Sequence, residues 1–342
     1  MTNIVKDNLF GITLPQLESL VDQHKWPKFA TRQIAEWLYR HHVTDFSEMS
    51  NLSIKIRNEL SASYALNCPA PAREQVSADG TKKYLFAYPG KGHIESAYIP
   101  EGKRHTLCVS SQVGCRMGCS FCMTARMGFK GNLSAGEILN QVRSIPERDL
   151  LTNIVFMGMG EPLDNLENVL QSLDVLTAEW GYGMSPRRIT VSTIGLVPAM
   201  LEFLEKSRCN LAVSLHSPFD EERRSLIPMA KAHKLDDILD AIRQFPIEKQ
   251  RRVSFEYIVF KDLNHSHHHV KALSRALNGI RCRINLLSFH PIPGSPLNSP
   301  ETTIIEDFRD ALERKGIVTT IRKSRGQDIQ AACGLLSSSE NK

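Results

Sequence analysis

The sequence predicts an α/β protein in which a parallel sheet follows a small helical domain. Three observations support this prediction: helical periodicity in about the first 65 residues, a hairpin pattern near residue 90, and six β-α repeats from Thr106 onward. Repeats of this kind imply a parallel sheet with helical crossovers. Periodicity alone leaves open whether such a sheet closes as a partial barrel or lies open.

Composition excludes several classes of protein. The chain has 342 residues, 42% of them hydrophobic and 23% charged, and no low-complexity tract, so disordered and fibrous architectures are excluded. No apolar run approaches the roughly 18 residues that span a bilayer, and residues 1–16 have no signal-peptide pattern, so we expect a cytoplasmic protein. The net charge of +5 permits an anionic partner without requiring one.

Residues 1–66 are expected to form the helical domain. Apolar side chains that share a face predict two helices, and a third short helix is expected over 52–60. The first face holds Leu17, Leu20 and Val21, and the second holds Phe29, Ile34, Trp37 and Leu38. Residues 67–100 are expected to form a linker and a β-hairpin, because the β-rich segments 82–88 and 93–99 flank a Pro-Gly-Lys-Gly turn.

The remaining elements alternate between strands and helices. Strands are expected at 106–110, 153–157, 188–193, 210–215, 253–259 and 283–289. Helices are expected near 134–144, 163–179, 197–206, 235–244 and 267–277. Ser134 and Glu137 have the spacing of a capping box, which supports the first of these helices.

Polar or sulfur-bearing residues follow five of the six predicted strands. They are a cysteine loop after the first strand, residues 158–161 after the second, Ser192 and Thr193 at the third, residues 214–216 at the fourth, and His290 after the sixth. In parallel β-α folds, ligands bind at the carboxyl ends of the strands, where these loops converge. We therefore expect one site at this end of the sheet.

The cysteine loop carries the most specific local pattern. Cys115, Cys119 and Cys122 have the spacing C-x3-C-x2-C, and such clustering in a reducing compartment indicates metal binding or redox chemistry. Three thiolates can hold three corners of an iron-sulfur cube and leave the fourth iron for a substrate. A structural zinc site is the alternative, but it requires four ligands, and Cys108 on the preceding strand lies in an awkward direction.

Four segments together resemble a known family. They are LCVSSQVGC at 107–115, MGMGEPL at 157–163, SLH at 214–216 and AACG at 331–334. Their combination is similar to the RlmN-type RNA methyltransferases of the radical S-adenosylmethionine (SAM) superfamily, over about Phe10 to Leu335. The resemblance implies a partial (β/α)6 TIM-like radical SAM barrel in residues 101–328, an N-terminal RNA-recognition domain in 1–66, and a functional C-terminal tail in 329–342.

The resemblance also implies a reaction. RlmN-type enzymes methylate C2 of one adenosine in 23S ribosomal RNA, at the peptidyl-transferase centre, and of the adenosine 3′ of the anticodon in a subset of transfer RNAs. It implies a 4Fe-4S cluster on the three loop cysteines and SAM as cofactors, because electron-poor C2 does not attack the SAM methyl group directly. Implied partners are these RNAs and an electron donor such as a flavodoxin-type reductant, with no membrane and a monomeric enzyme.

Three further residues acquire roles from the resemblance. Cys333 is implied as the methyl carrier, Cys108 as the thiol that releases the RNA by forming a disulfide with Cys333, and Glu95 as the base for the C2 proton. Taken alone, Cys333 would be a small packing residue, Cys108 a buried strand cysteine, and Glu95 a solvated group on an exposed hairpin face. SAM contacts are implied at Gly160, Glu161, Ser192, Ser214, Leu215, His216 and His290. His290 departs from the family, in which many members carry Asn.

Other polar groups are less specific. Basic residues at Arg126, Lys130, Arg322, Lys323 and Arg325 are equally compatible with RNA contact and with a solvated face. The histidines at 265 and 267–269 predict the start of a surface helix rather than a metal site, and Cys68, Cys209 and Cys282 are expected to be core thiols.

Two alternative functions remain at this point. One is the related antibiotic-resistance enzyme that methylates C8 of the same adenosine, which shares Cys108, Cys333 and the cluster. The segment 161–163 and the overall sequence of the chain resemble the C2 enzyme more than the C8 enzyme. The other is a non-catalytic RNA-binding protein stabilised by a metal.

Overall fold

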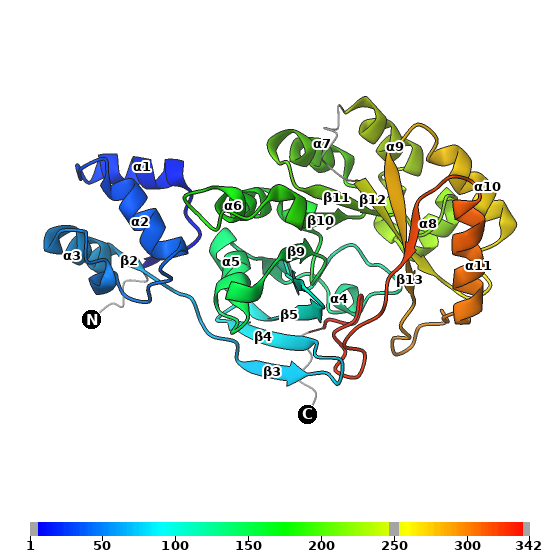
Figure 1. Cartoon of the computed structure of the whole chain (residues 1–342), viewed down its shortest axis with the longest axis horizontal. Coiled ribbons are helices and arrows are strands. Elements are labelled where there is room, and N and C mark those ends of the chain that lie inside the picture. The colour runs from blue at the N-terminus through cyan, green and yellow to red at the C-terminus, as the bar shows by residue number, and fades with distance from the viewer. Residues whose placement is uncertain (1–5, 246–252, 338–342) are drawn as a thin grey trace.

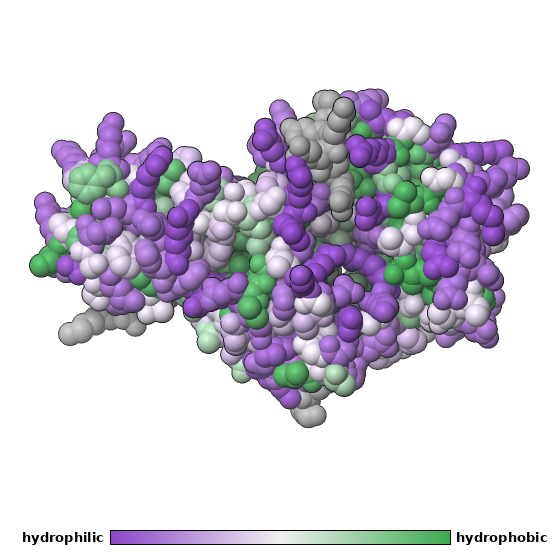
Figure 2. Space-filling model, in the orientation of Figure 1, coloured by the Kyte–Doolittle hydropathy of each residue, from purple (hydrophilic) through white to green (hydrophobic). Residues whose placement is uncertain are grey.

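The computed structural model describes residues 6–245 and 253–337. It shows a group of N-terminal helices beside a larger body built on a ten-stranded sheet (Figure 1). Hydrophilic residues cover most of the face in Figure 2, and apolar side chains appear there in smaller patches. Within these residues, no helix has the length and apolar character that crossing a membrane would require.

The N-terminal group forms the helices that periodicity predicts. They are α1 (Leu14–Gln23), α2 (Ala30–Tyr39) and α3 (Ile54–Ser63), with a 3-10 turn η1 (Phe46–Glu48) and a small parallel pair of β1 (Asp7–Asn8) with β2 (Tyr64–Ala65). Leu17, Ile34 and Leu38 are buried as expected. Phe29 is instead 63% exposed, because it lies at the N-cap of α2 and so outside the periodicity of that helix.

Seven parallel strands form the larger part of the main sheet. They are β6 (Arg104–Cys108), β9 (Asn153–Phe156), β10 (Ile189–Thr193), β11 (Asn210–Ser214), β12 (Val253–Val259), β13 (Cys282–Ser288) and β14 (Thr319–Ile321), paired in that order. The six predicted strands are confirmed, with ends displaced by at most two residues. The seventh, β14, is an addition, since a strand of three residues leaves little alternation in a sequence.

The predicted hairpin is confirmed, and it continues the main sheet. β4 (Lys82–Tyr88) pairs with β5 (Gly92–Glu101), and β3 (Arg73–Val76) pairs antiparallel with β4 at the edge. β5 also pairs antiparallel with β6, which places Ala97 opposite Cys108. Residues of the hairpin therefore share a sheet face with the first parallel strand.

Helices cover the outside of the sheet (Figure 1). They are α5 (Ala135–Arg143), α6 (Leu166–Thr177), α7 (Val197–Lys206), α9 (Leu235–Gln244), α10 (His267–Ala276) and α11 (Thr302–Glu313). The short helix α8 (Asp220–Leu226) lies instead at the carboxyl end of β11, where Ser120 N of the cysteine loop donates to Leu226 O. The predicted capping box is present, since Glu137 N donates to Ser134 Oγ at 3.2 Å and Ser134 N donates to Glu137 Oε2 at 2.7 Å. α8 and α11 were not predicted, although Ile305, Phe308 and Leu312 of α11 are buried at helical spacing.

Short elements surround the cysteine loop and connect the larger ones. They are β7 (Gln112–Val113) paired with β8 (Gly131–Asn132), α4 (Met123–Arg126), and the 3-10 turns η2 (Arg148–Leu150), η3 (Pro162–Asn165), η4 (Pro186–Arg188) and η5 (Pro228–Lys231).

The segment after β14 crosses from one edge of the main sheet to the other. Gly326 N donates to Asp79 Oδ2 at 3.0 Å. Asp328 accepts from Ser77 Oγ at 2.6 Å and from Ala78 N at 3.1 Å. The C-terminal tail is therefore anchored on the β3–β4 turn, as its path in Figure 1 shows. This anchoring brings residues 329–337 across the carboxyl ends of the strands.

Candidate active site

The cysteine loop lies in an apolar environment between β7 and α4. Cys115 is buried, and Cys119 and Cys122 are half-buried. Burial raises the pKa of Cys115 to about 12, and burial with the neighbouring Cys122 and Cys115 raises that of Cys119. Ionised thiols are therefore unfavourable here unless a positive group compensates them.

The donor set of this loop fits an iron-sulfur group. Three thiols come from one loop, and an apolar shell that includes Met117, Ile258 and Phe260 surrounds them. Among the residues that the structure describes, no three His, Cys, Asp or Glu side chains are already arranged as metal ligands.

Glu161 follows β9 and is buried, with 4% exposure. Its Oε1 accepts a hydrogen bond from Leu163 N at 3.1 Å, and its Oε2 accepts one from Ile194 N at 3.0 Å. Burial nonetheless raises its pKa to about 7. The preceding Gly160 has a φ of +98°, and a Cβ there would collide with Gln112. This turn thus presents a buried carboxylate next to closely packed backbone.

The other predicted SAM contacts lie at the ends of the next strands. Ser192 and Ser214 are half-buried on β10 and β11, and Leu215 is fully buried, with its N–H donating to Glu256 O at 2.9 Å. His216 has a φ of +57° and accepts from Ile258 N through Nδ1 at 3.0 Å. Burial lowers the pKa of His216 to about 3, so its ring is neutral near pH 7.

The ring of His216 also reaches the cysteine loop. It packs edge-on against Phe121, with 4.8 Å between the ring centroids. His290, in contrast, faces the segment between β14 and the C-terminal tail, because its Nε2 lies 2.8 Å from Ser324 Oγ. Burial lowers the pKa of His290.

Glu95 is not a solvated surface group. It is 3% exposed on β5, so the alternative of an exposed hairpin glutamate is wrong. The hairpin becomes part of the main sheet, which buries this face. Oε1 of Glu95 lies 3.1 Å from Lys83 Nζ, and Oε2 accepts a hydrogen bond from Ser337 N at 2.9 Å. The sequence pattern gave no indication of Lys83 as its partner.

Cys108 and Cys333 lie close together although their positions in the chain differ by 225. Cys108 packs with Ala97 and with Ala331 of the tail. Burial raises the pKa of Cys108 to about 12, and the adjacent Cys333 adds to this effect. Solvent reaches Cys333, yet the protein atoms around it also raise its pKa, and the guanidinium of Arg322 opposes the rise at both thiols.

The tail also contacts the cysteine loop. Met123 N of α4 donates to Gly334 O at 2.8 Å, and Thr124 Oγ1 donates to Leu336 O at 2.6 Å. The residue after Cys333 therefore rests on the helix that follows Cys122. The structure thus places the candidate methyl carrier between Cys108 and the candidate cluster loop.

A polar group inside the barrel was missed by sequence reasoning. Glu256 on β12 is 6% exposed, and its Oε1 accepts from Asn285 Nδ2 at 2.7 Å and from Ser254 Oγ at 3.1 Å. Its Oε2 lies 4.0 Å from Arg322 Nη1 and has no hydrogen-bond partner in the described parts of the chain. A glutamate within a strand buried on both faces was the available signal.

Arg223 was missed as well. Its side chain is fully buried, and it donates to the carbonyl oxygens of Ile194, of Ser214 at 3.4 Å and of His233 at 3.2 Å. It therefore holds the ends of β10 and β11 together beneath the cysteine loop.

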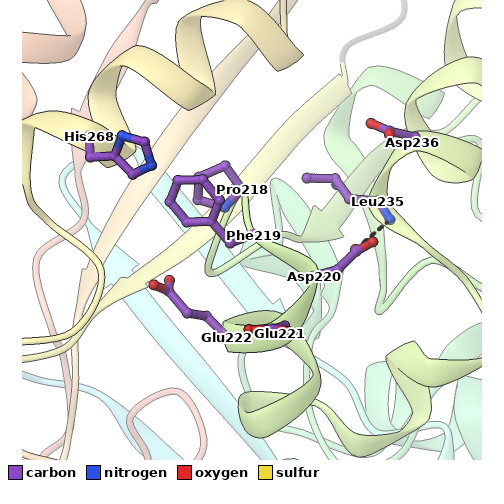
Figure 3. A pocket seen from close by; sticks show the side chains of 8 residues that line it. All are labelled: Pro218, Phe219, Asp220, Glu221, Glu222, Leu235, Asp236 and His268. Carbon is purple, nitrogen blue, oxygen red and sulfur yellow. Dashed lines mark hydrogen bonds between the residues drawn. The ribbon is translucent and has the colours of Figure 1, made fainter.

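A hollow of about 490 Å³ beside α8, α9 and α10 is separate from these residues (Figure 3). Its lining includes Asp220, Glu221, Glu222 and Asp236, and the ring of His268 stacks on Phe219 at 4.8 Å. None of the predicted site residues lines it.

The histidine run does begin α10, as predicted, and Cys68, Cys209 and Cys282 pack in or against the main core.

Comparisons with known proteins agree with this architecture. Residues 7–66 match the ribosomal RNA large subunit methyltransferase N-terminal domain, and residues 109–273 match the radical SAM superfamily. A probable dual-specificity RNA methyltransferase RlmN of Parabacteroides distasonis is 52% identical, over 98% of this chain and 98% of its own length. One of Porphyromonas gingivalis is 53% identical over 97% of each chain.

A solved structure gives the same result for the fold. The crystal structure of a radical SAM methyltransferase from Sphaerobacter thermophilus has a TM-score of 0.90 and 39% identity, and covers 97% of this chain and 100% of its own. The predicted α/β fold is thereby confirmed, including the N-terminal domain and the parallel radical SAM sheet. Such similarity over nearly the whole length, on a fold that carries the three-cysteine loop at its first parallel strand, shows that this chain belongs to the RlmN family of radical SAM RNA methyltransferases.

Proposed function

We propose that this enzyme methylates C2 of a specific adenosine in 23S ribosomal RNA and of the adenosine 3′ of the anticodon in a subset of transfer RNAs. The full-length similarity to dual-specificity RNA methyltransferases supports the substrate class. The observation that carries the chemistry is the position of the tail, which packs against Cys108 and also contacts the helix after Cys122.

The proposal assigns the cofactor sites to residues at the strand ends. Cys115, Cys119 and Cys122 would hold a 4Fe-4S cluster, and Gly160, Glu161, Ser192, Ser214, Leu215, His216 and His290 would surround SAM. When bound, these groups supply the methyl group and the one-electron chemistry that an electron-poor carbon requires. Glu161 would accept a hydrogen bond from the SAM ammonium, and His216, being neutral, adds no positive charge beside it.

Cys333 would carry the methyl-derived carbon to C2 of the adenine, and this carbon would give up one hydrogen atom before the bond to C2 forms and one electron afterwards, both to the cofactors. Because the tail holds this carbon next to the bound base, the addition becomes effectively intramolecular. Glu95 would then take the proton from C2. The Cys108 thiolate would attack the sulfur of Cys333, so that a sulfur–sulfur bond forms as the sulfur–carbon bond breaks and the released carbon takes up a proton. An external thiol reductant would restore both cysteines.

The proposal also includes a monomeric cytoplasmic enzyme and a flavodoxin-type electron donor. The N-terminal helices would contact the RNA, as the name of the matching domain suggests.

Mass spectrometry of digested RNA from a strain that lacks the gene tests the function. Loss of 2-methyladenosine from 23S ribosomal RNA and transfer RNA is expected, and the gene supplied on a plasmid should restore it. An unchanged level of 2-methyladenosine contradicts the proposal. Loss of 8-methyladenosine instead would identify the C8-methylating relative.

A further inference from the structure

We propose that Lys83 is a positioning residue that fixes one oxygen of Glu95 and leaves the other to accept the proton from C2. This inference rests on the proposed function, in which Glu95 is the base. Three features of the hairpin determine how the fold orients that base.

The first observation is the register of the hairpin. Lys83 lies opposite Ala97, and Leu85 lies opposite Glu95, so Lys83 is the diagonal neighbour of Glu95 on one sheet face. Ala97 in turn lies opposite Cys108 of β6. Because paired residues project to the same side, Lys83, Glu95 and Cys108 all face the tail that carries Cys333.

The second observation is burial. Lys83 is 6% exposed and Glu95 is 3% exposed, and their charged atoms are 3.1 Å apart. The free energy needed to remove two charged groups from water usually exceeds the attraction between them. A buried ion pair therefore stabilises the fold little, compared with apolar side chains of similar size. The pair is better explained by what it does to Glu95, which it holds in one orientation.

The third observation distinguishes the two carboxylate oxygens. Oε1 is bound by the Lys83 ammonium, whereas Oε2 accepts one backbone N–H, from Ser337. A charge-assisted bond to a buried ammonium is stronger than a single neutral N–H bond. Ser337 also belongs to the tail, which must move during the reaction if Cys333 serves both SAM and RNA. When the tail moves, Oε2 loses its hydrogen bond with Ser337 N and becomes free to accept a proton, while Lys83 stays bound to Oε1.

The neighbouring Lys82 provides a matched control. It projects to the opposite face of β4, where its Nζ lies 3.0 Å from Glu74 and 2.7 Å from Glu147. A Lys82→Met variant removes the same charge from the same strand and loses two ion pairs, but none with Glu95.

The experiment uses the anaerobically purified holoenzyme with an RNA fragment that the wild-type enzyme methylates. Intact-protein mass spectrometry measures the S-methyl group on Cys333, denaturing gels measure the covalent protein–RNA adduct, and nucleoside analysis measures 2-methyladenosine. The variants are Lys83→Met, Lys83→Arg and Lys82→Met, with Glu95→Gln and the double variant Lys83→Met/Glu95→Gln.

We expect Lys83→Met to form S-methyl Cys333 and the adduct as the wild type does, but to release product roughly tenfold more slowly, so that the adduct accumulates. Lys83→Arg should recover most of the rate, and Lys82→Met should behave as the wild type. The double variant should be no slower than Glu95→Gln alone, because Lys83 acts only through Glu95.

Three results would overturn the inference: wild-type release by Lys83→Met, equal loss of S-methylation and release in that variant, or a double variant much slower than Glu95→Gln. If Lys83→Met does not fold, the release rate of the double variant compared with that of Glu95→Gln still tests the inference. The double variant is expected to fold, because it leaves no unpaired buried charge. Failure of the wild type itself to form S-methyl Cys333 or 2-methyladenosine would instead refute the proposed function.

Discussion

Replacing Glu161 with Gln should remove a large pH dependence from the stability of the protein. The pKa of Glu161 is raised by burial from an ordinary 4.5 to about 7, so the fold favours its protonated form. Its contribution to stability is fully present below about pH 4.5, and it is lost as the pH rises to about 7, because the unfolded chain ionises first. The difference between the two pKa values corresponds to about 3 kcal/mol.

The assay is thermal unfolding of the SAM-free protein from pH 5 to pH 8. Between these limits the contribution falls by about 2.5 kcal/mol, so we expect the Tm of the wild type to fall by about 5 °C more than that of Glu161→Gln, since a long chain loses about 2 °C per kcal/mol. The slopes of Tm against pH are compared rather than single Tm values. This is because a Gln amide also changes the hydrogen bond with Ile194 N, which shifts the Tm at every pH. Parallel curves for the two proteins would refute the reasoning.

The same shift predicts how SAM binds. An ammonium placed beside Glu161 stabilises the carboxylate, so SAM affinity should increase as the pH rises from 5 to 7, by at most about tenfold per pH unit for one proton. In Glu161→Gln, this increase should be absent. An affinity that is independent of pH in the wild type would show that the ammonium binds elsewhere.

Four other substitutions have defined outcomes. Cys108→Ala should trap RNA covalently on the protein and Cys333→Ala should not, as denaturing gels of the purified proteins will show; absence of an adduct in Cys108→Ala would exclude the resolving role. Cys119→Ala should leave anaerobically purified protein without the brown colour and the reduced-cluster EPR signal of the wild type, whereas an unchanged iron content would contradict the assignment of the loop. Gly160→Ala should weaken SAM binding by about 10-fold or more, measured by calorimetry, because the φ of +98° and the collision with Gln112 both force the turn to move; wild-type affinity would show that the turn does not contact SAM.

Local patterns in the sequence were sufficient for most of the architecture. Hydrophobic patterns with periods of 2 and 3.6 residues predicted the six strands and most helices, and three cysteines within eight residues indicated a candidate metal-binding loop. The polar residues at strand ends were also predictable, because a parallel sheet brings those ends together whatever its exact register.

What the sequence could not provide was the pairing of distant elements. Lys83 and Glu95 meet only because β4 and β5 have one particular register, and Glu95 is buried only because β5 joins β6. Glu256 could be recognised as a polar group of the interior only from the structure, which places its carboxylate 4.0 Å from Arg322 Nη1. The structural role of Arg223 was not predictable for a similar reason. Its three acceptors are backbone carbonyl oxygens, which every residue type carries, so no sequence pattern identifies them.

The anchoring of the tail on the β3–β4 turn has a consequence for the order of assembly. Ser77 and Asp328 bond across 251 positions, so this contact carries a high loop-closure cost and forms late. Chains are synthesised from the N-terminus, and residues 322–337 emerge after every strand of the sheet has been made. Until Gly334 and Leu336 reach Met123 and Thr124, the cysteine loop is uncovered on that side. In newly made chains, the three loop thiols proposed to bind the cluster are therefore accessible before Cys333, the proposed methyl carrier, reaches its place above them.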